Sequence, residues 1–366
     1  GGKMTKQRKN TNDLTRRRFL KWTAGGVLGA GALTLGIRPW KKTAKGQTTV
    51  STTRPAMGTF VEIKATGEDE SRLNEAVDKA YKKIAEVDET MSVFKEGSQV
   101  RELNREGRKE LTVNPEVMEV LKRSKKIAEL TDGSFDVTSA PLLDLWGFYG
   151  DELQVPSEEE IERTLKLIDH KELKLHEASG TVSLPDKRSA IDLGGVAKGY
   201  AVDKGIKLLK EEGLASGLIN AGGDIRGFGS PEGKENWRVG LQDPTNEDEL
   251  LAGMDLILPA VTTSGNYESF FTYRGSRLGH IIDPETGRPV EDVLSVSVLT
   301  EEAVMADGLS TAAFSQGAEE AVATASRLED TELIYIKRSS NGRTQVELTE
   351  GLKGVVDGGK LEVALN

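Results

Sequence analysis

The sequence has no cysteine, and only 3 histidines and 5% aromatic residues among its 366 residues. Without cysteine the protein cannot form disulfides, thiolate nucleophiles, zinc–cysteine sites or a lipid-modified N-terminal cysteine. A fold without crosslinks depends on its hydrophobic core, and a chain of this length can bury a large one, as one domain or as two lobes. The chemistry therefore has to come from carboxylates, hydroxyls, backbone groups and the few histidines.

Only one of the three histidines is a serious candidate for catalysis. His170 and His176 lie in a charged stretch that is typical of a surface, whereas His280 stands just before the turn-forming residues 283–289. One interpretation makes His280 a base that takes a proton from a hydroxyl near neutral pH. The alternative is that His280 is an ordinary strand residue and that Asp283 simply starts the turn.

The sequence also lacks an apolar run long enough to span a membrane. Its most apolar segment, residues 22–37, is rich in glycine and shorter than the roughly 20 residues that a spanning helix needs. The segment follows Thr-Arg-Arg-Arg-Phe-Leu-Lys at residues 15–21, so the order resembles a twin-arginine export signal. We expect residues 1–46 to comprise a cloning remnant, Gly1 to Lys3, and this signal. The mature protein would then be periplasmic or extracytoplasmic, or membrane-associated if the signal is retained.

Positive charge is scarce in the rest of the chain. Residues 47–366 hold 37 basic and 58 acidic residues, a net charge of −21. Such a body repels nucleic acid and anionic lipid, so we expect no nucleic-acid partner. An anionic substrate would have to be met by a local cationic patch, a helix N-terminus or a metal ion.

Hydrophobic periodicity predicts an α+β fold with mostly antiparallel sheets and packed helices. No compositional break divides the chain, so we expect a single domain over residues 47–350 and a C-terminal tail over 351–366. Helices are predicted over 70–90, 98–106, 115–131, part of a peripheral acidic insertion at 151–170, 196–210 and 304–328. Extended segments are predicted over 48–65 with an interruption at 55–59, 133–138, 173–175, 181–184, 190–193, 217–220, 237–241, 255–258, 260–263, 270–273, 294–299, 333–337 and 344–348.

An oxygen-rich metal site is predicted near residue 307. Asp307 and Thr311 are four residues apart and share one face of a helix, with Ser310 beside them. A carboxylate next to hydroxyls, with no nearby cysteine or histidine, suits a hard cation such as Mg²⁺. The alternative is that Asp307 caps the start of a helix and that the hydroxyls are incidental.

Two glycine-rich turns are candidates for binding a phosphate. Gly194 and Gly195 stand where a strand turns into a helix, with Lys198 in the first helical turn, so backbone N–H groups can face an anion. The order matches neither a dinucleotide-binding fingerprint nor a Walker A loop, and a turn that merely needs glycine explains it as well. The second turn, at a later strand end, comprises Gly222, Gly223 and Asp224.

The order of these pieces along the chain resembles the ApbE family of FAD:protein FMN transferases. The resemblance covers residues from about 50 to 345 and is carried by segments 57–59, 91–94, 135–138, 192–199, 220–224, 280–289 and 306–312. It implies a T-fold-related, two-lobed single domain that binds FAD and Mg²⁺. It also implies that the enzyme breaks the pyrophosphate, releases AMP and places FMN on a Thr or Ser hydroxyl of an acceptor protein through a phosphoester bond.

The resemblance assigns roles to individual residues. The metal would be held by Asp307, Thr311 and the carbonyl of Gly195, with Ser310 as an extra ligand. The base for the acceptor hydroxyl would be His280, with Asp283 in the same segment. FAD contacts are implied or predicted at Met57, Phe94, Ser134, Phe135, Asp136, Asp192, Lys198, Gly222, Gly223, Asp224 and His280. Phe94 departs from the tyrosine that is common at its position, so ring stacking would persist while a phenol hydrogen bond is lost.

Three functions follow from the same site. The first is FMN transfer to a protein, the second is FAD hydrolysis to FMN and AMP, and the third is passive binding of FAD by an exported protein. The acceptor-type pattern Ser/Thr-Gly-Ala/Ser-Thr is absent, and its nearest match at residues 263–266 lacks the final Thr. The protein is therefore expected to modify another protein, such as an extracytoplasmic subunit of a membrane redox complex or a flavin-carrying reductase.

Overall fold

The structure is a computed structural model that describes residues 47–107, 109–150, 153–231, 235–246, 248–266, 270–273, 276–339 and 344–357. The predicted export signal and the end of the predicted tail lie outside these residues. Among the helices described, none is long and apolar enough to cross a bilayer.

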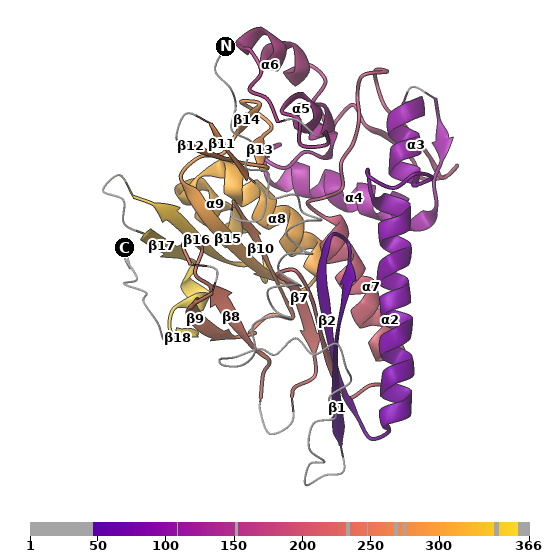
Figure 1. The fold of residues 1–366 in the computed structure, drawn as a ribbon, viewed down its shortest axis with the longest axis vertical. Coiled ribbons are helices and arrows are strands. Elements are labelled where there is room, and N and C mark those ends of the chain that lie inside the picture. Colours follow the sequence, from indigo (N-terminus) through magenta and orange to yellow (C-terminus); the bar gives the residue numbers. More distant parts are fainter. Residues whose placement is uncertain are drawn as a thin grey trace.

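An eight-stranded sheet forms the centre of the molecule (Figure 1). Every pair of neighbouring strands in it is antiparallel, which confirms the predicted α+β class. In spatial order the strands are β1 (Thr48–Ala56), β2 (Thr59–Gly67), β6 (Ser216–Ala221), β7 (Asp224–Phe228), β10 (Ala260–Gly265), β15 (Val293–Thr300), β16 (Glu332–Arg338) and β17 (Thr344–Leu348).

The part of the sheet around β16 is buried on both faces. Leu333 and Tyr335 point into the larger hydrophobic core, and Ile334 and Ile336 point into a second core. Successive side chains of a strand face opposite sides of a sheet, so a strand that is apolar at every position needs a covering layer on each side.

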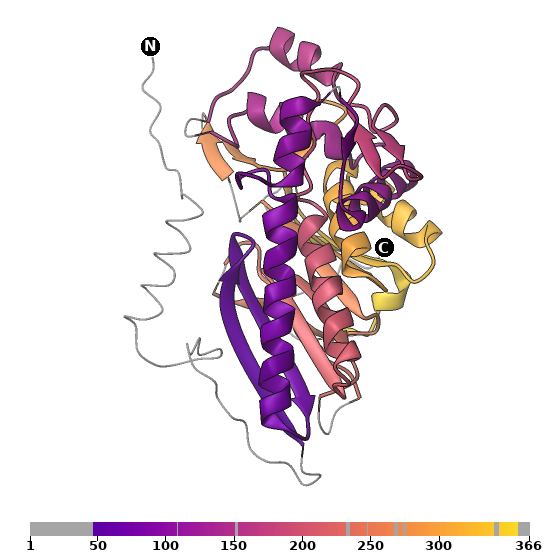
Figure 2. The ribbon, with the colours of Figure 1, turned by 90° about the vertical axis from the view of Figure 1, so that its right-hand side faces the viewer.

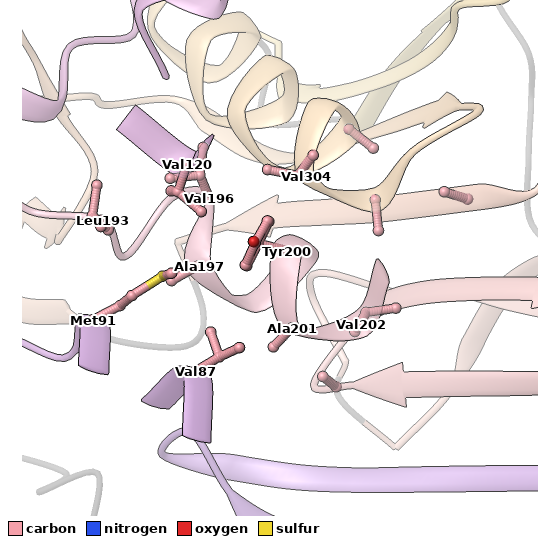
Figure 3. Packing of buried hydrophobic residues seen from close by; sticks show 14 of the residues in the cluster. Val87, Met91, Val120, Leu193, Val196, Ala197, Tyr200, Ala201, Val202 and Val304 are labelled. Carbon is pink, nitrogen blue, oxygen red and sulfur yellow. The ribbon is translucent and has the colours of Figure 1, made fainter. Parts of the chain in front are cut away.

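Helices supply the first layer. The long helix α2 (Glu70–Met91) and α7 (Ala197–Glu211) lie side by side against the sheet, and α8 (Ala303–Gln316) continues the layer beyond α7 (Figure 2). Tyr200 of α7 packs among apolar side chains from α2, α4 and α8 (Figure 3). Within the described residues, the other helices are α3 (Gln99–Glu106), α4 (Pro115–Leu130), α5 (Ala140–Leu145), α6 (Glu158–Leu165) and α9 (Ala318–Arg327), with short 3₁₀ turns η1 (Val137–Ser139) and η2 (Glu350–Leu352).

A small sheet covers the other face. It consists of β8 (Arg238–Gln242), β9 (Leu250–Asp255) and β18 (Val356–Asp357), in the order β18-β9-β8. Met254 of β9 and Trp237, which directly precedes β8, share the second core with residues of β16. Because β18 pairs with β9, the ordered fold extends at least to Asp357, beyond the predicted start of the tail at residue 351.

A cap of shorter elements lies at one end of the molecule. It contains α5, α6 and the hairpin β13 (Ile282–Asp283) and β14 (Arg288–Pro289), near the hairpin β11 (Phe270–Tyr273) and β12 (Ser276–Gly279) (Figure 1). Trp146 donates a hydrogen bond from its indole N–H to the carbonyl of Gly287 at 2.9 Å, which ties the helical part of the cap to the hairpin. A three-stranded sheet, β3 (Leu111–Thr112), β5 (Thr181–Ser183) and β4 (Lys174–His176), completes the fold.

Several local predictions were wrong. Residues 255–258 do not form a strand, because the β9 strand ends at Asp255 and the chain bends before β10 begins. Residues 190–193 join no sheet, and residues 133–136 form a turn that leads into η1, which contains residues 137 and 138. The helix predicted over 304–328 is broken at Gly317, whose φ of 81° is outside the helical range and favours glycine.

Candidate active site

Helix α8 brings the predicted metal ligands into contact with α7. A Cβ added at Gly199 of α7 would lie 2.3 Å from the carbonyl oxygen of Ala303, so the two helices approach as closely as they do only because residue 199 is glycine. This approach allows the backbone N–H of Gly199 to donate a hydrogen bond to Asp307 Oδ2 at 3.0 Å. Asp307 is therefore an interior helix residue, and the alternative that it caps a helix start is wrong.

The carboxylate of Asp307 is suited to a cation. Its residue is 3% exposed, and no hydrogen bond from the described residues reaches Oδ1. The pKa of Asp307 is raised from 3.8 to about 7: burial is the largest cause, the negative charge of Asp224 adds to it, and Lys198 and the Gly199 N–H oppose the shift. A buried, under-neutralised carboxylate is stabilised by a bound cation, so this residue fits the implied Mg²⁺.

Thr311 of α8 lies beside Gly195 of the Gly-Gly turn. A Cβ on Gly195 would be 3.1 Å from Thr311 Oγ1, so the Gly-Gly turn touches the outer face of α8. The Thr311 hydroxyl donates to the carbonyl of Asp307 at 3.1 Å, which leaves its oxygen lone pairs available to a cation. No group of three or more His, Cys, Asp or Glu side chains within the described ranges could hold a metal, so phosphate oxygens or water would have to complete the shell.

Ser310 is bonded within α8 and to the neighbouring strand. Its side chain is fully buried, donates to the carbonyl of Asp307 at 2.9 Å, and contacts Ser264 Oγ on strand β10 at 2.8 Å. The hydroxyl therefore ties α8 to the sheet. Its predicted role as an extra metal ligand stays a prediction.

The second glycine-rich turn meets the first through an ion pair. Lys198 at the start of α7 pairs with Asp224 of β7, whose side chain is 1% exposed. Gly222 and Gly223 have φ values of 66° and 103°, which only glycine adopts readily. A Cβ on Gly222 would lie 2.4 Å from Thr59 Oγ1, so the β1–β2 hairpin tip with Met57 packs against this turn.

A cavity of about 700 Å³ is lined by Ala190, which precedes the Gly-Gly turn in the chain. Phe94, 67% exposed, lines it together with Tyr149, and the two rings meet edge to face with centroids 5.7 Å apart. The phenol of Tyr149 donates to Asp192, and Asp192 accepts the backbone N–H of Gly194. One chain of hydrogen bonds therefore connects the aromatic wall to the turn beside Thr311.

Sequence reasoning missed part of the cavity wall. It did not single out Tyr149 or the cations Arg101 and Arg188, which lie 39 or more residues from one another but line the same cavity. Tyr149 stands in an aromatic-rich stretch, Trp146 to Tyr149, and this clustering was the one available signal. The sequence offered no signal for Arg101 and Arg188, because single arginines spread along a soluble protein are common.

Residues 134–136, where FAD contacts are predicted, pack against neighbouring segments and against the Gly-Gly turn at residues 194 and 195. Asp136 accepts hydrogen bonds from the N–H and hydroxyl of Thr138, both at 2.7 Å, and from the N–H and ring of His170 at 2.8 and 3.2 Å. His170 is 7% exposed, so its predicted surface position is wrong. Phe135 lies within 3.1 Å of the Cβ position at Gly195, and the carbonyl of Ser134 accepts from Ser315 of α8. The direct flavin contacts predicted here stay predictions.

The His280 segment lies at the end of strand β12. His280 is half-buried there, and Asp283 accepts the N–H of Glu285 at 2.9 Å and the hydroxyl of Thr286 at 2.7 Å. These bonds support the interpretation in which Asp283 starts a turn. The catalytic roles of both residues stay predictions.

The metal-free protein should lose stability as pH rises. With its raised pKa, Asp307 keeps a proton in the folded state between about pH 4 and 7, where the unfolded chain has released it. The folded state then binds more protons, so the free energy of unfolding falls across this window, by on the order of 2–4 kcal/mol. Urea unfolding without metal should show this fall for the wild type and a flatter profile for Asp307→Asn.

Added Mg²⁺ should restore the wild type at pH 8 and leave Asp307→Asn unchanged. The exposed residue Glu319 of α9 provides a control, since Glu319→Gln removes a carboxylate without touching the site. Parallel pH profiles for the wild type and Asp307→Asn would contradict the assignment of a strained, buried charge to this residue.

Comparison with known proteins agrees with the geometry. The sequence profile of the ApbE family matches residues 57–335. An FAD:protein FMN transferase of Vibrio cholerae is 32% identical over 297 residues, covering 77% of this chain and 86% of that protein. Among solved structures, the ApbE protein of Thermotoga maritima superimposes with a TM-score of 0.78 at 32% identity, over 85% of this chain and all of that one. A flavin transferase ApbE from Vibrio cholerae gives a TM-score of 0.73 at 28% identity, over 84% of this chain and 99% of that one. This chain belongs to the ApbE family.

Proposed function

We propose that this protein is an FAD:protein FMN transferase, which moves FMN from FAD to a Thr or Ser hydroxyl of an acceptor protein and releases AMP. The observation that carries the proposal is the packing of α8 against the start of α7, where Asp307 accepts the N–H of Gly199 and Thr311 lies beside Gly195. The hydrogen bonds from Tyr149 through Asp192 to Gly194 join the wall of an aromatic cavity to the same turn. The names of the relatives, FAD:protein FMN transferase, support the same reaction.

The region where α8 packs against the start of α7, around Asp307, Thr311 and Gly195, has the groups that a pyrophosphate-binding site needs. Asp307, Thr311 and the carbonyl of Gly195 would hold Mg²⁺, which supplies charge neutralisation for the pyrophosphate and for the departing AMP. Lys198, with 27% of its side chain exposed, adds a positive charge at the same place. Since the body is acidic, these groups are needed to admit a dianionic substrate.

The aromatic cavity would hold a ring system of FAD. Phe94 offers an exposed ring face, and Tyr149 meets it edge-on, so a flat heteroaromatic ring entering the cavity gains stacking contacts and apolar burial. The hydrogen bonds from Tyr149 through Asp192 to Gly194 keep this wall at a fixed place relative to the phosphate-binding turn.

The chemical step exchanges one phosphorus–oxygen bond for another. The acceptor hydroxyl attacks the FMN phosphorus, the bond to the bridging oxygen breaks, and AMP leaves with that oxygen. We propose that His280 takes the proton of the attacking hydroxyl. Water in place of the acceptor would give FMN and AMP by the same route, so FAD hydrolysis is the second candidate function, and passive FAD binding is the third.

One assay separates the three functions. The purified protein is incubated with FAD, Mg²⁺ and proteins from an extracytoplasmic fraction, because we propose that the chain is exported and that its acceptor belongs to a redox complex there. Mass spectrometry should find an acceptor peptide that has gained the mass of an FMN phosphoester, with one AMP released for each flavin transferred. Free FMN and AMP without a modified protein would favour hydrolysis, and intact FAD would overturn the enzymatic proposal.

A further inference from the structure

We propose that Asn266 is a positioning residue for the transfer reaction, because it joins the segment that carries His280 to the strand that contacts the metal-binding helix. The inference rests on the proposed function, in which His280 acts as the base. Asn266 follows β10 directly and is 8% exposed.

The side-chain amide of Asn266 bridges the segment that follows β14 and the start of β15. Its Nδ2 donates to the carbonyl of Val290 at 3.1 Å and to the carbonyl of Val293 at 3.2 Å. These two acceptors fix the orientation of the amide, since the flipped form would place Oδ1 against two carbonyl oxygens. The carbonyl of Ile281 in turn accepts the N–H of Val290, so the bridge reaches the residue that follows His280.

The other end of the amide faces the backbone immediately before His280. Asn266 Oδ1 is buried, and it accepts no hydrogen bond from the residues that the structure describes. A Cβ on Gly279 would lie only 1.8 Å from this oxygen, so the end of β12 passes directly over the amide. Only glycine at residue 279 leaves room for this close contact. Because Gly279 rests on the Asn266 amide, the amide determines the position of the next residue, His280.

The same short segment touches the metal-binding helix. Ser264, two residues before Asn266, lies 2.8 Å from Ser310 Oγ and 3.4 Å from Thr311 Oγ1. Residues 264–266 therefore contact α8 at one end and the His280 segment at the other. A rigid link of this kind fixes the distance between the phosphate end of the site and the proposed base, on which in-line attack depends.

Asn266→Ala removes both bridging hydrogen bonds without crowding Gly279. We expect kcat for FMN transfer to fall about 10- to 100-fold, as for an ångström-scale misplacement of a catalytic group, while KM for FAD changes less than about twofold. In a His280→Ala background, Asn266→Ala should have no further effect on kcat, because the group that it positions is gone.

A matched control separates positioning from stability. Asn114→Ala removes the helix cap of α4, so it should lower thermal stability and leave kcat unchanged. Should Asn266→Ala fail to fold, Gly279→Ala tests the same contact with Asn266 intact, and His280→Ala should suppress its effect as well.

The outcomes distinguish the inference from the function on which it rests. If His280→Ala lowers transfer but Asn266→Ala or Gly279→Ala lowers it further by its full factor, Asn266 acts independently and the inference is wrong. If His280→Ala leaves transfer unchanged, both the proposed base and the inference are wrong. If the wild type transfers no FMN, the failure is that of the proposed function.

Discussion

Replacing Asp307 with asparagine is expected to abolish metal-dependent FMN transfer, with a loss of at least about a thousandfold in kcat/KM. The amide keeps the shape of the side chain and can still accept the hydrogen bond from the N–H of Gly199. It removes the one negative charge that this helix offers to a cation. A metal ion supplies several kcal/mol of charge stabilisation in phosphoryl transfer, and each 1.36 kcal/mol corresponds to a tenfold change in rate.

The assay should follow AMP release and protein flavinylation over a range of Mg²⁺ concentrations. Glu319→Gln is the matched control, because it neutralises an exposed carboxylate on the neighbouring helix α9 and should retain wild-type kinetics. Isothermal titration with Mg²⁺ in the presence of FAD should show binding to the wild type and none to Asp307→Asn. Turnover of Asp307→Asn with unchanged Mg²⁺ dependence would place the metal elsewhere.

The local part of this site was predictable from sequence because it depends on helical spacing. Asp307 and Thr311 are one turn apart on α8, and such a spacing places side chains on a common face wherever the helix lies. The class of fold followed in the same way from alternating apolar residues and turn signals. Each of these inferences needs only neighbouring residues.

The contacts that turn this face into a site are long-range, and sequence spacing carries no information about them. Gly199 and Asp307 are 108 residues apart, and their hydrogen bond depends on the close packing of two helices. His170 was misjudged for the same reason, because its charged neighbours suggested a surface while its partner Asp136 lies 34 residues away. The resemblance to the ApbE family pointed to Asp192 and to the Gly-Gly turn, but the chain of contacts from Tyr149 to Gly194 required the structure.

Replacing His280 with alanine is expected to lower FMN transfer to the acceptor protein by about 10²- to 10⁴-fold, the usual contribution of a general base. The residues Asp307, Thr311 and Gly195 and the aromatic cavity belong to other segments, so Mg²⁺ binding should persist and FAD should lose only its predicted contact with His280. The effect should fall on kcat, since the proton is transferred only in the chemical step. A histidine base also predicts that the wild-type rate rises with pH across the neutral range and that His280→Ala loses this rise.

His176→Ala is the matched control for this substitution. His176 lies on β4, with about half of its side chain exposed, and its ring nitrogen is 3.6 Å from Glu110. Its loss should change neither the rate of transfer nor the pH profile. Single-turnover flavinylation under saturating FAD and Mg²⁺ isolates the chemical step from acceptor binding and product release. If His280→Ala keeps the rising limb of the pH profile, the proton is taken by another group, and the substitution acts by disturbing the loop that Asn266 holds.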